Sequence, residues 1–283
     1  MNRRQLVKAS LLISTAPLLA RASAFKIINV NYVRLLRHAT LHLSLGNVQF
    51  LVDPMLSVKE AMDPVANAGN EFRIPMTDLP VNPQRLREII AGVDAILLTH
   101  LHRDHWDKAA QEIIPPNKPI YCQPGDKEKI QSQGFEKVTA IDDVVKFQDI
   151  TIHRTGGRHG LGSIGEKMGA VSGYVLQHDH CSIYIAGDTV YCEEVQSAIK
   201  QYLPSCIIVN SGEATFINEG PITMDANNVV RTYKESSSSK FIAVHMDTVN
   251  HCKLTRAMLR EELCHQGLET KISLPKDGET IYL

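Results

Sequence analysis

The sequence has little cysteine, little net charge and no long apolar run. Its six cysteines lack the Cys-x-x-Cys spacing of a zinc knuckle and the pattern of a disulfide scaffold, although one or two pairs could form in an oxidising compartment. A formal net charge of −1 creates no field that would recruit nucleic acid or an anionic membrane. The apolar stretches fall short of the roughly 20 residues that span a bilayer. We therefore expect no nucleic-acid partner and no stable membrane insertion, and a small-molecule substrate is compatible with this balance.

Histidine, in contrast, is plentiful, and the rest of the composition is that of an ordinary globular protein. Hydrophobic residues make up 43% and charged residues 22% of the 283-residue chain, which is enough apolar material for a substantial core. The twelve histidines are informative because imidazole is the commonest neutral metal ligand and the usual proton carrier near pH 7. Residues that bind metal or move protons are therefore sought first among the histidines.

The first 24 residues have the features of an export signal. Arg3 and Arg4 form a basic start, a modest apolar stretch follows, and residues 22–24 are small, as a signal peptidase prefers. The start resembles the twin-arginine export signal, apart from two flanking positions. We expect a signal peptide over 1–24, one domain over 25–283, and a periplasmic or secreted protein. A frayed amphipathic N-terminus is the alternative.

Two β-rich stretches, each followed by helices, organise the domain. In the first half we expect strands over 25–33, 39–45, 48–52, 93–98, 120–121 and 137–141, and helices over 83–91, 104–113 and 127–133. In the second half we expect strands over 144–147, 150–154, 172–177, 182–186, 206–209 and 241–244, and helices over 193–201, 225–233 and 255–265. This order predicts the α/β (α+β) class, with two mixed sheets packed face to face and helices outside.

Residues 54–80 interrupt this pattern. They are rich in proline and methionine and show little periodicity, which indicates a long loop. Long loops inside compact domains often form lids or binding loops. A disordered insertion is the alternative.

The segment around residues 100–105 carries the densest group of chemically active residues. A buried apolar strand ends at Thr99, and three histidines and an aspartate follow: His100, His102, Asp104 and His105. The first two histidines are two positions apart, so in extended geometry their side chains point the same way. Asp104 and His105 lie at the expected start of a helix and can point to a second location nearby. Imidazole nitrogens and carboxylate oxygens suit Zn, Fe or Mn ions, and the segment therefore predicts a metal site.

This H-x-H-x-D-H pattern, after an apolar strand and before a helix, resembles the signature of the metallo-β-lactamase superfamily. The resemblance covers essentially the whole mature chain and implies an αββα sandwich with two divalent metal ions at one sheet edge, zinc above all, with Mn or Fe as alternatives. It also implies three further ligands at strand ends, in the order His, Asp, His, and these positions are filled by His159, Asp188 and His245. By the resemblance, one ion is held by His100, His102 and His159. The second is held by Asp104, His105 and His245, with Asp188 as the bridge.

The resemblance further implies a mechanism and supporting residues. Two ions that share a water supply hydroxide at neutral pH, and Asp104 could orient that hydroxide and pass a proton to the leaving group. Asp53 matches an aspartate that braces a metal-bound histidine; an ordinary turn cap is the alternative. His38 matches an early histidine that approaches the metals in the UlaG-like branch, and it is a second candidate catalytic residue. A solvated strand face is the alternative for His38.

Three more residues are candidates for contact with the substrate. Tyr191 follows Asp188 closely and could donate a hydrogen bond to a developing oxyanion, although a core aromatic is equally compatible. His251 and Arg256 follow His245 and could line the wall of a pocket. An exposed loop histidine and a surface arginine are the alternatives.

The predicted chemistry is hydrolysis. Asp188 stands where true β-lactamases commonly have cysteine, which favours cleavage of a lactone, ester or phosphoester by a metal-bridging hydroxide over cleavage of a β-lactam. The UlaG-like branch, which includes an ascorbate-6-phosphate lactonase, is the closest resemblance, and relatives of this branch form homo-oligomers. An exported metal-binding or sensor protein of the same fold without turnover is the alternative. A two-iron redox enzyme is disfavoured, because the chain has no room for a flavin-binding domain.

Overall fold

The computed structural model describes residues 30–283, and these form a sandwich of two seven-stranded sheets. The first sheet is ordered β14 (Thr280–Tyr282), β1 (Tyr32–Arg37), β2 (Thr40–Leu45), β3 (Val48–Val52), β4 (Ala95–Leu97), β5 (Ile120–Cys122) and β6 (Val138–Ala140). The second is ordered β13 (Ile272–Ser273), β12 (Lys240–Val244), β11 (Cys206–Asn210), β10 (Cys181–Ile185), β9 (Ser172–His178), β8 (Ile150–Gly156) and β7 (Val144–Phe147). Both sheets contain parallel and antiparallel pairs.

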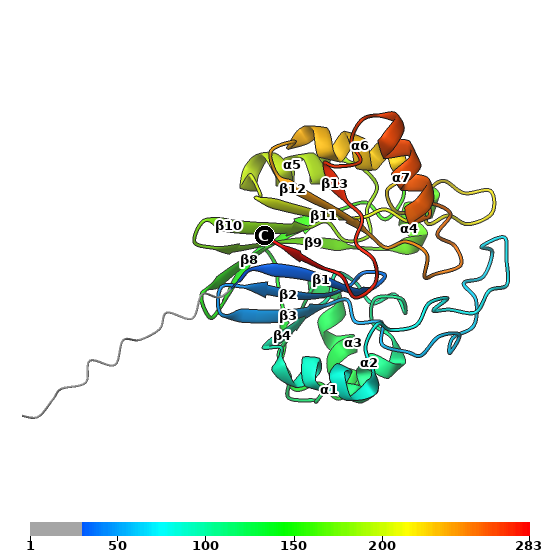
Figure 1. Cartoon of the computed structure of the whole chain (residues 1–283). Coiled ribbons are helices and arrows are strands. Elements are labelled where there is room, and N and C mark those ends of the chain that lie inside the picture. Colours follow the sequence, from blue (N-terminus) through cyan, green and yellow to red (C-terminus); the bar gives the residue numbers. More distant parts are fainter. Residues whose placement is uncertain (1–29) are drawn as a thin grey trace, which may run out of the picture.

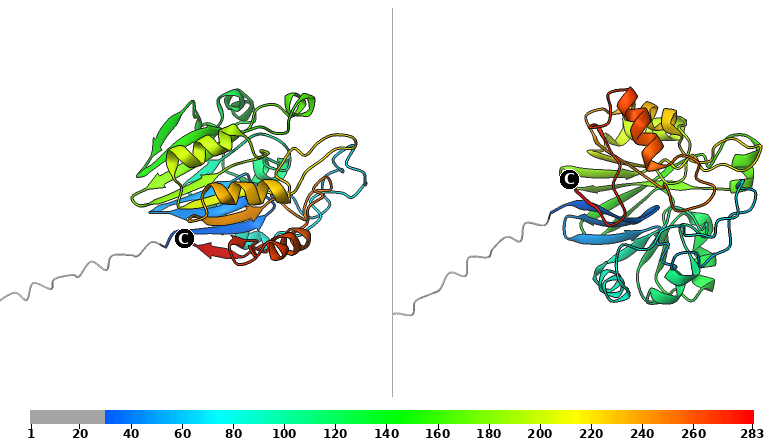
Figure 2. Two further views of the ribbon diagram at one scale, coloured as in Figure 1. Left: turned by 90° about the horizontal axis from the view of Figure 1, so that it is seen from above. Right: turned by 45° about the vertical axis from the view of Figure 1, so that its right-hand side comes forward.

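Helices cover the outer face of each sheet, as Figure 1 shows and the two views in Figure 2 support. The first sheet is covered by α1 (Pro83–Gly92), α2 (Lys108–Ile113) and α3 (Lys127–Ser132), with a short 3-10 turn η1 (Pro124–Asp126) before α3. The second is covered by α5 (Glu193–Tyr202), α6 (Ala226–Glu235) and α7 (Arg256–His265). A further short helix, α4 (Ser163–Met168), lies in the connection between β8 and β9. The predicted αββα sandwich is confirmed.

The main core lies between the two sheets. Alternate residues of β2 point into it, namely Leu41, Leu43 and Leu45, and they belong to one buried cluster with Tyr174 and Leu176 of β9. Full burial of each such aliphatic side chain stabilises the fold by about 1.5–3 kcal/mol. A further buried cluster lies between the first sheet and its helices, and another lies between the second sheet and its helices. Each sheet is therefore buried on both faces.

The helix after the 100–105 segment begins later than the sequence predicts, at Lys108 instead of residue 104. Asp107 is its N-cap, since one carboxylate oxygen accepts a hydrogen bond from the Ala110 N–H at 2.8 Å. Its other oxygen accepts from the Ser57 N–H at 2.7 Å. Asp104 and His105 lie in a tight turn in which the His105 N–H donates to the His102 carbonyl at 2.9 Å. A turn stabilised by a buried cap, and not a helix, therefore orients these two side chains.

Other boundaries differ where the sequence signal is short. The first strand was predicted over 25–33, but β1 begins at Tyr32, and the earlier part of that prediction lies outside the described residues. The structure adds α4, β13 and β14, which are too short to show a periodicity. Strand β14 pairs antiparallel with β1, so the last residues of the chain complete the first sheet.

The loop 54–80 is ordered along the side of the sandwich and runs at the right of Figure 1. The guanidinium of Arg37 is fully buried and donates hydrogen bonds of 2.8–3.0 Å to three loop carbonyls, those of Met55, Ser57 and Thr77. Farther along the loop, the side chain of Asn250 exchanges hydrogen bonds with the backbone of Val65. The loop is therefore a fixed wall next to the segment that follows β12, and the alternative of a disordered insertion is excluded.

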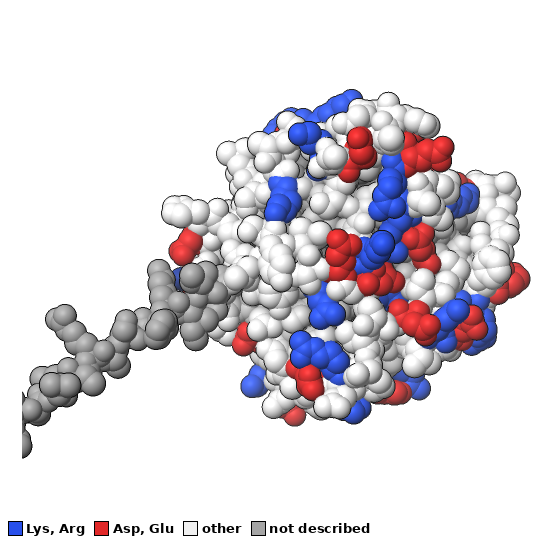
Figure 3. Space-filling view, viewed as in Figure 1, with Lys and Arg blue, Asp and Glu red and all other residues white. Residues whose placement is uncertain are grey.

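The predicted export signal over residues 1–24 lies outside the described residues. Within residues 30–283, none of the helices combines the length and the apolar character needed to cross a membrane. Basic and acidic side chains are interspersed on the face shown in Figure 3.

Candidate metal centre

The seven predicted ligands converge at one edge of the sandwich. The first sheet contributes the 100–105 segment, which directly follows β4. The second sheet contributes the residues that follow β8, β10 and β12, namely His159, Asp188 and His245. Strands β3 and β4 are parallel, as are β10, β11 and β12, and the carboxyl ends of parallel strands meet at the same edge of a sheet. Packing of the two sheets then brings the two edges together.

The ligand atoms form three overlapping groups, and within each group they lie within 4.8 Å of one another. The groups are His100, His102 and His159; His100, His105 and Asp188; and His38, Asp104, His105 and His245. The first group is the first ligand set expected from the resemblance, and the last group is the second set with His38 added. The middle group joins Asp188 to one histidine from each set. Each group contains one residue from the second sheet.

The contacts inside the cluster fit a bound cation. His100 Nε2 lies 3.0 Å from His102 Nδ1, and His105 Nε2 lies 3.2 Å from His245 Nε2. The carboxylate of Asp188 faces the second pair, 3.2 Å from each of its Nε2 atoms. Imidazole lone pairs that converge on a buried carboxylate form the donor set of Zn, Mn or Fe. The residues present therefore fit a divalent metal ion.

Asp53 braces this cluster at the end of β3. Its carboxylate lies 2.9 Å from His105 Nδ1, which leaves His105 Nε2 free to face the cluster. It also accepts hydrogen bonds from Thr99, at 2.8 Å from the backbone N–H and 2.6 Å from the hydroxyl. The Thr99 hydroxyl oxygen is in turn 3.1 Å from His100 Nδ1. One buried carboxylate thus orients two histidines, which is the arrangement that outer carboxylates give to metal-binding imidazoles.

The three ligands from the second sheet also have outer partners. His159 Nδ1 donates to the Ile222 carbonyl at 2.9 Å, so its Nε2 is the atom available to a metal. Asp188 accepts from the Asn210 amide at 2.6 Å. His245 Nδ1 lies 3.6 Å from the Cys252 thiol. Sequence reasoning missed these partners and Thr99; for Thr99 and Asn210, a polar residue at the end of a buried strand was the available signal.

The cluster attracts positive charge. Burial alone would lower the pKa of His105, but Asp188, Asp104 and Asp53 raise it well above its ordinary value. Burial alone would raise the pKa of Asp188, but His105 and His245 hold it well below its ordinary range. The buried carboxylates therefore stay ionised near neutral pH, and a proton or a metal cation must balance them.

His38 lies in the turn between β1 and β2 and is fully buried, not solvated. Its Nε2 is 3.2 Å from Asp104 Oδ2, and its ring centroid is 3.7 Å from that of His245. Burial, followed by the neighbouring His245, lowers the pKa of His38 to about 3. A neutral His38 can donate its Nε2 hydrogen to Asp104 and so hold that carboxylate in place.

The three substrate candidates lie in different surroundings. The Tyr191 hydroxyl donates to Glu235, and the guanidinium of Arg231 lies 4.1 Å from the centre of its ring. Arg256 is paired with two aspartates, Asp247 and Asp277. The structure does not bring these two residues to the metal ligands.

His251, in contrast, lies near the metal ligands. It is 6% exposed, so it is not an exposed loop residue, and its ring packs on Phe216 with centroids 5.6 Å apart. Its Nδ1 atom is buried and has no hydrogen-bond partner among the described residues. Burial lowers the pKa of His251 to about 4. The smaller effects of Asp104, which raises this pKa, and of His245, which lowers it, oppose each other.

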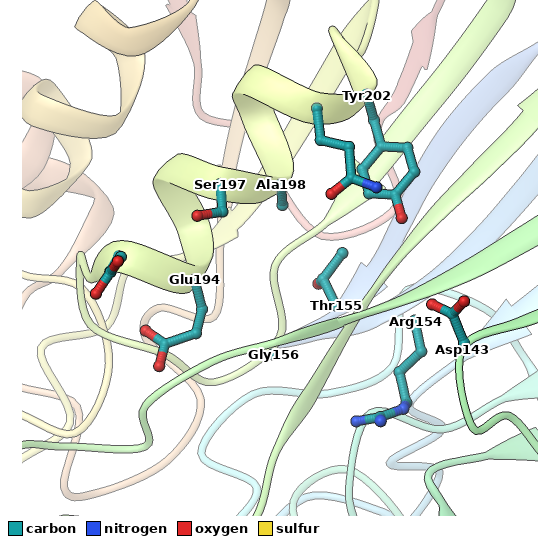
Figure 4. A pocket seen from close by; sticks show the side chains of 10 residues that line it. Asp143, Arg154, Thr155, Gly156, Glu194, Ser197, Ala198 and Tyr202 are labelled. Carbon is teal, nitrogen blue, oxygen red and sulfur yellow. The ribbon is translucent and has the colours of Figure 1, made fainter.

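A cleft of about 460 Å³ opens directly beside the cluster. The residues that line it include the ligands His100 and His102, together with Gln123, Arg154 and Met168. Another cavity, of about 390 Å³, lies between β8 and α5 and is shown in Figure 4, where Glu194, Ser197 and Tyr202 project from the helix. The residues that line it include none of the metal ligands, so of these two cavities the first cleft is the one beside the cluster.

Comparisons with known proteins bear on the family and the fold. Residues 49–246 match the family described as Beta-lactamase superfamily domain. The UPF0173 protein YddR of Bacillus subtilis is 33% identical over 250 residues, which cover 87% of this chain and 97% of that protein. A crystal structure of a possible metal-dependent hydrolase from Veillonella parvula is 34% identical with a TM-score of 0.86, and the match covers 90% of this chain and 100% of that one. The structure of isothiocyanate hydrolase from Delia radicum gut bacteria is 38% identical with a TM-score of 0.84, covering 89% and 99%.

Proposed function

Because the chain belongs to the β-lactamase superfamily and is a metal-dependent hydrolase of the metallo-β-lactamase fold, we propose that it hydrolyses a small uncharged substrate at an electrophilic carbon, an isothiocyanate in particular. The observation that carries this proposal is the 38% identity, over 89% of the chain, to an isothiocyanate hydrolase. Uncharged esters and lactones offer a similar electrophilic carbon and form the second substrate class.

The lining of the cleft supports an uncharged substrate. Among the described residues that line it, Arg154 is the one lysine or arginine side chain. Its guanidinium already donates to the Asp142 carbonyl at 2.8 Å and contacts the Ser172 hydroxyl at 3.5 Å. Apart from a bound metal ion, a phosphoester would therefore find no unpaired lysine or arginine side chain in this lining to pair with its charge. We place phosphoesters last among the predicted substrates.

We propose that the cluster holds two divalent ions, zinc above all. The first would be held by His100, His102 and His159, and the second by Asp104, His105 and His245, with Asp188 between them. Bound ions of this kind lower the pKa of water enough to supply a nucleophile at neutral pH.

Asp104 and His38 are the proposed catalytic residues of the chain itself. Burial alone would raise the pKa of Asp104, but His105, and after it His38 at 3.2 Å, hold that pKa well below its ordinary range. Asp104 is therefore ionised and can accept a proton from the attacking water. It then passes this proton to the substrate nitrogen. For an isothiocyanate, R–N=C=S, water adds to the central carbon and gives the thiocarbamic acid R–NH–C(=S)–OH. The C–N bond of this acid then breaks as its hydroxyl proton moves to the nitrogen. The products are the amine R–NH₂ and carbonyl sulfide, so one water balances the reaction and no oxidant is needed.

The test is turnover by the full chain after loading with zinc, manganese or iron. Benzyl isothiocyanate, an aryl ester, a lactone and a phosphodiester form the panel, and loss of substrate is followed together with the metal content. Asp104→Ala is expected to lower turnover by at least ~100-fold. If Asp104→Ala keeps its metal and its turnover, the catalytic assignment is wrong. If the metal-loaded wild type cleaves nothing in the panel, the alternative of a metal-binding or sensor protein is favoured.

We also propose that the protein is exported by the twin-arginine route. The support is the paired Arg3 and Arg4 and the small residues before Phe25. Replacing both arginines with lysine should retain the chain in the cytoplasm, and cell fractionation measures this. Equal export of the lysine variant would contradict the proposal.

A further inference from the structure

An apolar crevice lies between α4 and the loop 213–220, adjoining the cleft beside the metal cluster. It has a volume of about 420 Å³, and its apolar lining consists of Ile164, Met168, Phe216 and Ile217. Met168 lines both this crevice and the cleft that contains His100 and His102. We refer to it as the α4 crevice. The crevice and the cleft therefore adjoin at Met168.

The apolar wall of the α4 crevice packs against residues that contact two metal ligands. Buried Ile164, Ala214 and Ile222 form a small apolar cluster, against which Met168, Phe216 and Cys252 pack. The carbonyl of Ile222 accepts the hydrogen bond from His159 Nδ1 at 2.9 Å, and the thiol of Cys252 lies 3.6 Å from His245 Nδ1. The wall of the crevice is therefore joined, through buried apolar packing, to the side of the metal centre that the second sheet supplies.

The charges at the crevice neutralise each other. Lys167 Nζ lies 3.1 Å from Glu219 Oε1, and both residues line the crevice. The remaining polar lining is uncharged, from Asn67 and Asn218. A charged group placed there would lose hydration without gaining an unpaired counter-ion, whereas an apolar group would be removed from water.

We propose that the α4 crevice binds the apolar substituent of the substrate, and that Met168 and Phe216 select which substituents are accepted. This inference rests on the proposed function, because it places the reacting carbon at the metal cluster. The cavity of Figure 4 does not suit this role, since it is lined by the carboxylates of Asp143, Glu193 and Glu194. Burial of apolar surface improves binding by roughly fourfold for each methylene group.

The experiment compares methyl, butyl and benzyl isothiocyanate as substrates of the metal-loaded full chain. For the wild type, kcat/KM should rise at least tenfold from the methyl to the butyl and benzyl compounds. Met168→Glu places a charge in the crevice and should lower kcat/KM at least tenfold more for benzyl than for methyl, mainly through KM. Met168 is half-buried at the end of a short helix, so the fold should tolerate the change, and circular dichroism checks this.

Two variants serve as controls. Met168→Leu keeps the apolar volume, and Met258→Glu makes the same chemical change at a half-exposed position on α7; both should retain the wild-type preference. Equal kcat/KM for all three compounds in the wild type, or equal losses for methyl and benzyl in Met168→Glu, would overturn the inference.

A binding measurement separates this inference from the proposed function. Thiols bind metal sites without being hydrolysed, so calorimetry with benzyl thiol and ethanethiol reports on the crevice even when turnover is absent. A preference for benzyl thiol that Met168→Glu abolishes supports the crevice even if the isothiocyanates are not hydrolysed. Equal affinities for the two thiols, unaffected by the variant, would refute it.

Discussion

Replacement of Asp53 by asparagine should weaken metal binding without unfolding the protein. The two wild-type carboxylate oxygens receive three contacts: the Thr99 N–H reaches Oδ1, while the Thr99 hydroxyl and His105 Nδ1 both reach Oδ2. Asparagine offers only one acceptor oxygen in the same space. Each of its two orientations therefore breaks a different part of this arrangement.

If the amide oxygen takes the Oδ2 position, the amide NH₂ faces the backbone N–H of Thr99. Such a buried donor without an acceptor costs ~1–3 kcal/mol, equivalent to about 2–4 °C in Tm for each kcal/mol in a domain of this size. If the oxygen takes the Oδ1 position, the NH₂ faces His105 Nδ1. The imidazole proton must then move to Nε2, which is the atom that faces the cluster. Loss of such an outer partner lowers metal affinity by roughly 10–100-fold.

Zinc titration and thermal unfolding with and without a chelator measure both effects for Asp53→Asn. Asp149→Asn is a matched control, because Asp149 forms an Asp–His contact of 3.0 Å with His178 on a hairpin away from the cluster. The control should bind zinc as the wild type does. Zinc affinity within threefold of wild type for Asp53→Asn, with an unchanged Tm, would show that Asp53 does not orient the ligands.

Three further predictions concern the metal and the wall of the site. Chelation should lower Tm, since an ion at 100 times its dissociation constant contributes about 2.7 kcal/mol; an unchanged Tm would mean that no ion stabilises the fold. Asp188→Ala removes the carboxylate that faces both His105 and His245, and it should lower metal affinity by at least ~100-fold. Elemental analysis after dialysis measures this, and metal that stays bound to the variant would contradict the prediction. Arg37→Lys should lower the free energy of unfolding by about 1.5–3 kcal/mol, because an ammonium cannot reach all the carbonyls that the guanidinium contacts. Limited proteolysis should then cut faster within loop 54–80, and an unchanged rate would contradict this.

The sequence predicts the sandwich because most strands and helices are long enough to show their period. The 100–105 segment is recognisable from the sequence because its four candidate ligands are close together along the chain. His159, Asp188 and His245 are separated widely in sequence, and only the resemblance to a family connects them. The rule that they follow strand ends is local, but their meeting point depends on the packing of the two sheets.

What the sequence could not predict depends on tertiary contacts. The start of α2 at Lys108 is set by Asp107, which caps the helix and also binds the distant backbone of Ser57. The contact between His38 and Asp104 joins residues 66 positions apart, so no local pattern reveals it. Tyr191 follows Asp188 closely in the sequence, which made its hydroxyl a candidate for contact with the substrate. In the structure this hydroxyl donates to Glu235 on α6 instead.

The division of the ligands between the sheets has a consequence for how the protein matures. Since every group of donors needs one residue from the second sheet, neither half of the chain can form a complete coordination sphere alone. A bound ion acts as a reversible cross-link between the halves, and it restricts the unfolded chain as other long-range cross-links do. Complete coordination therefore requires that the two sheets have associated, and a bound ion should oppose their separation.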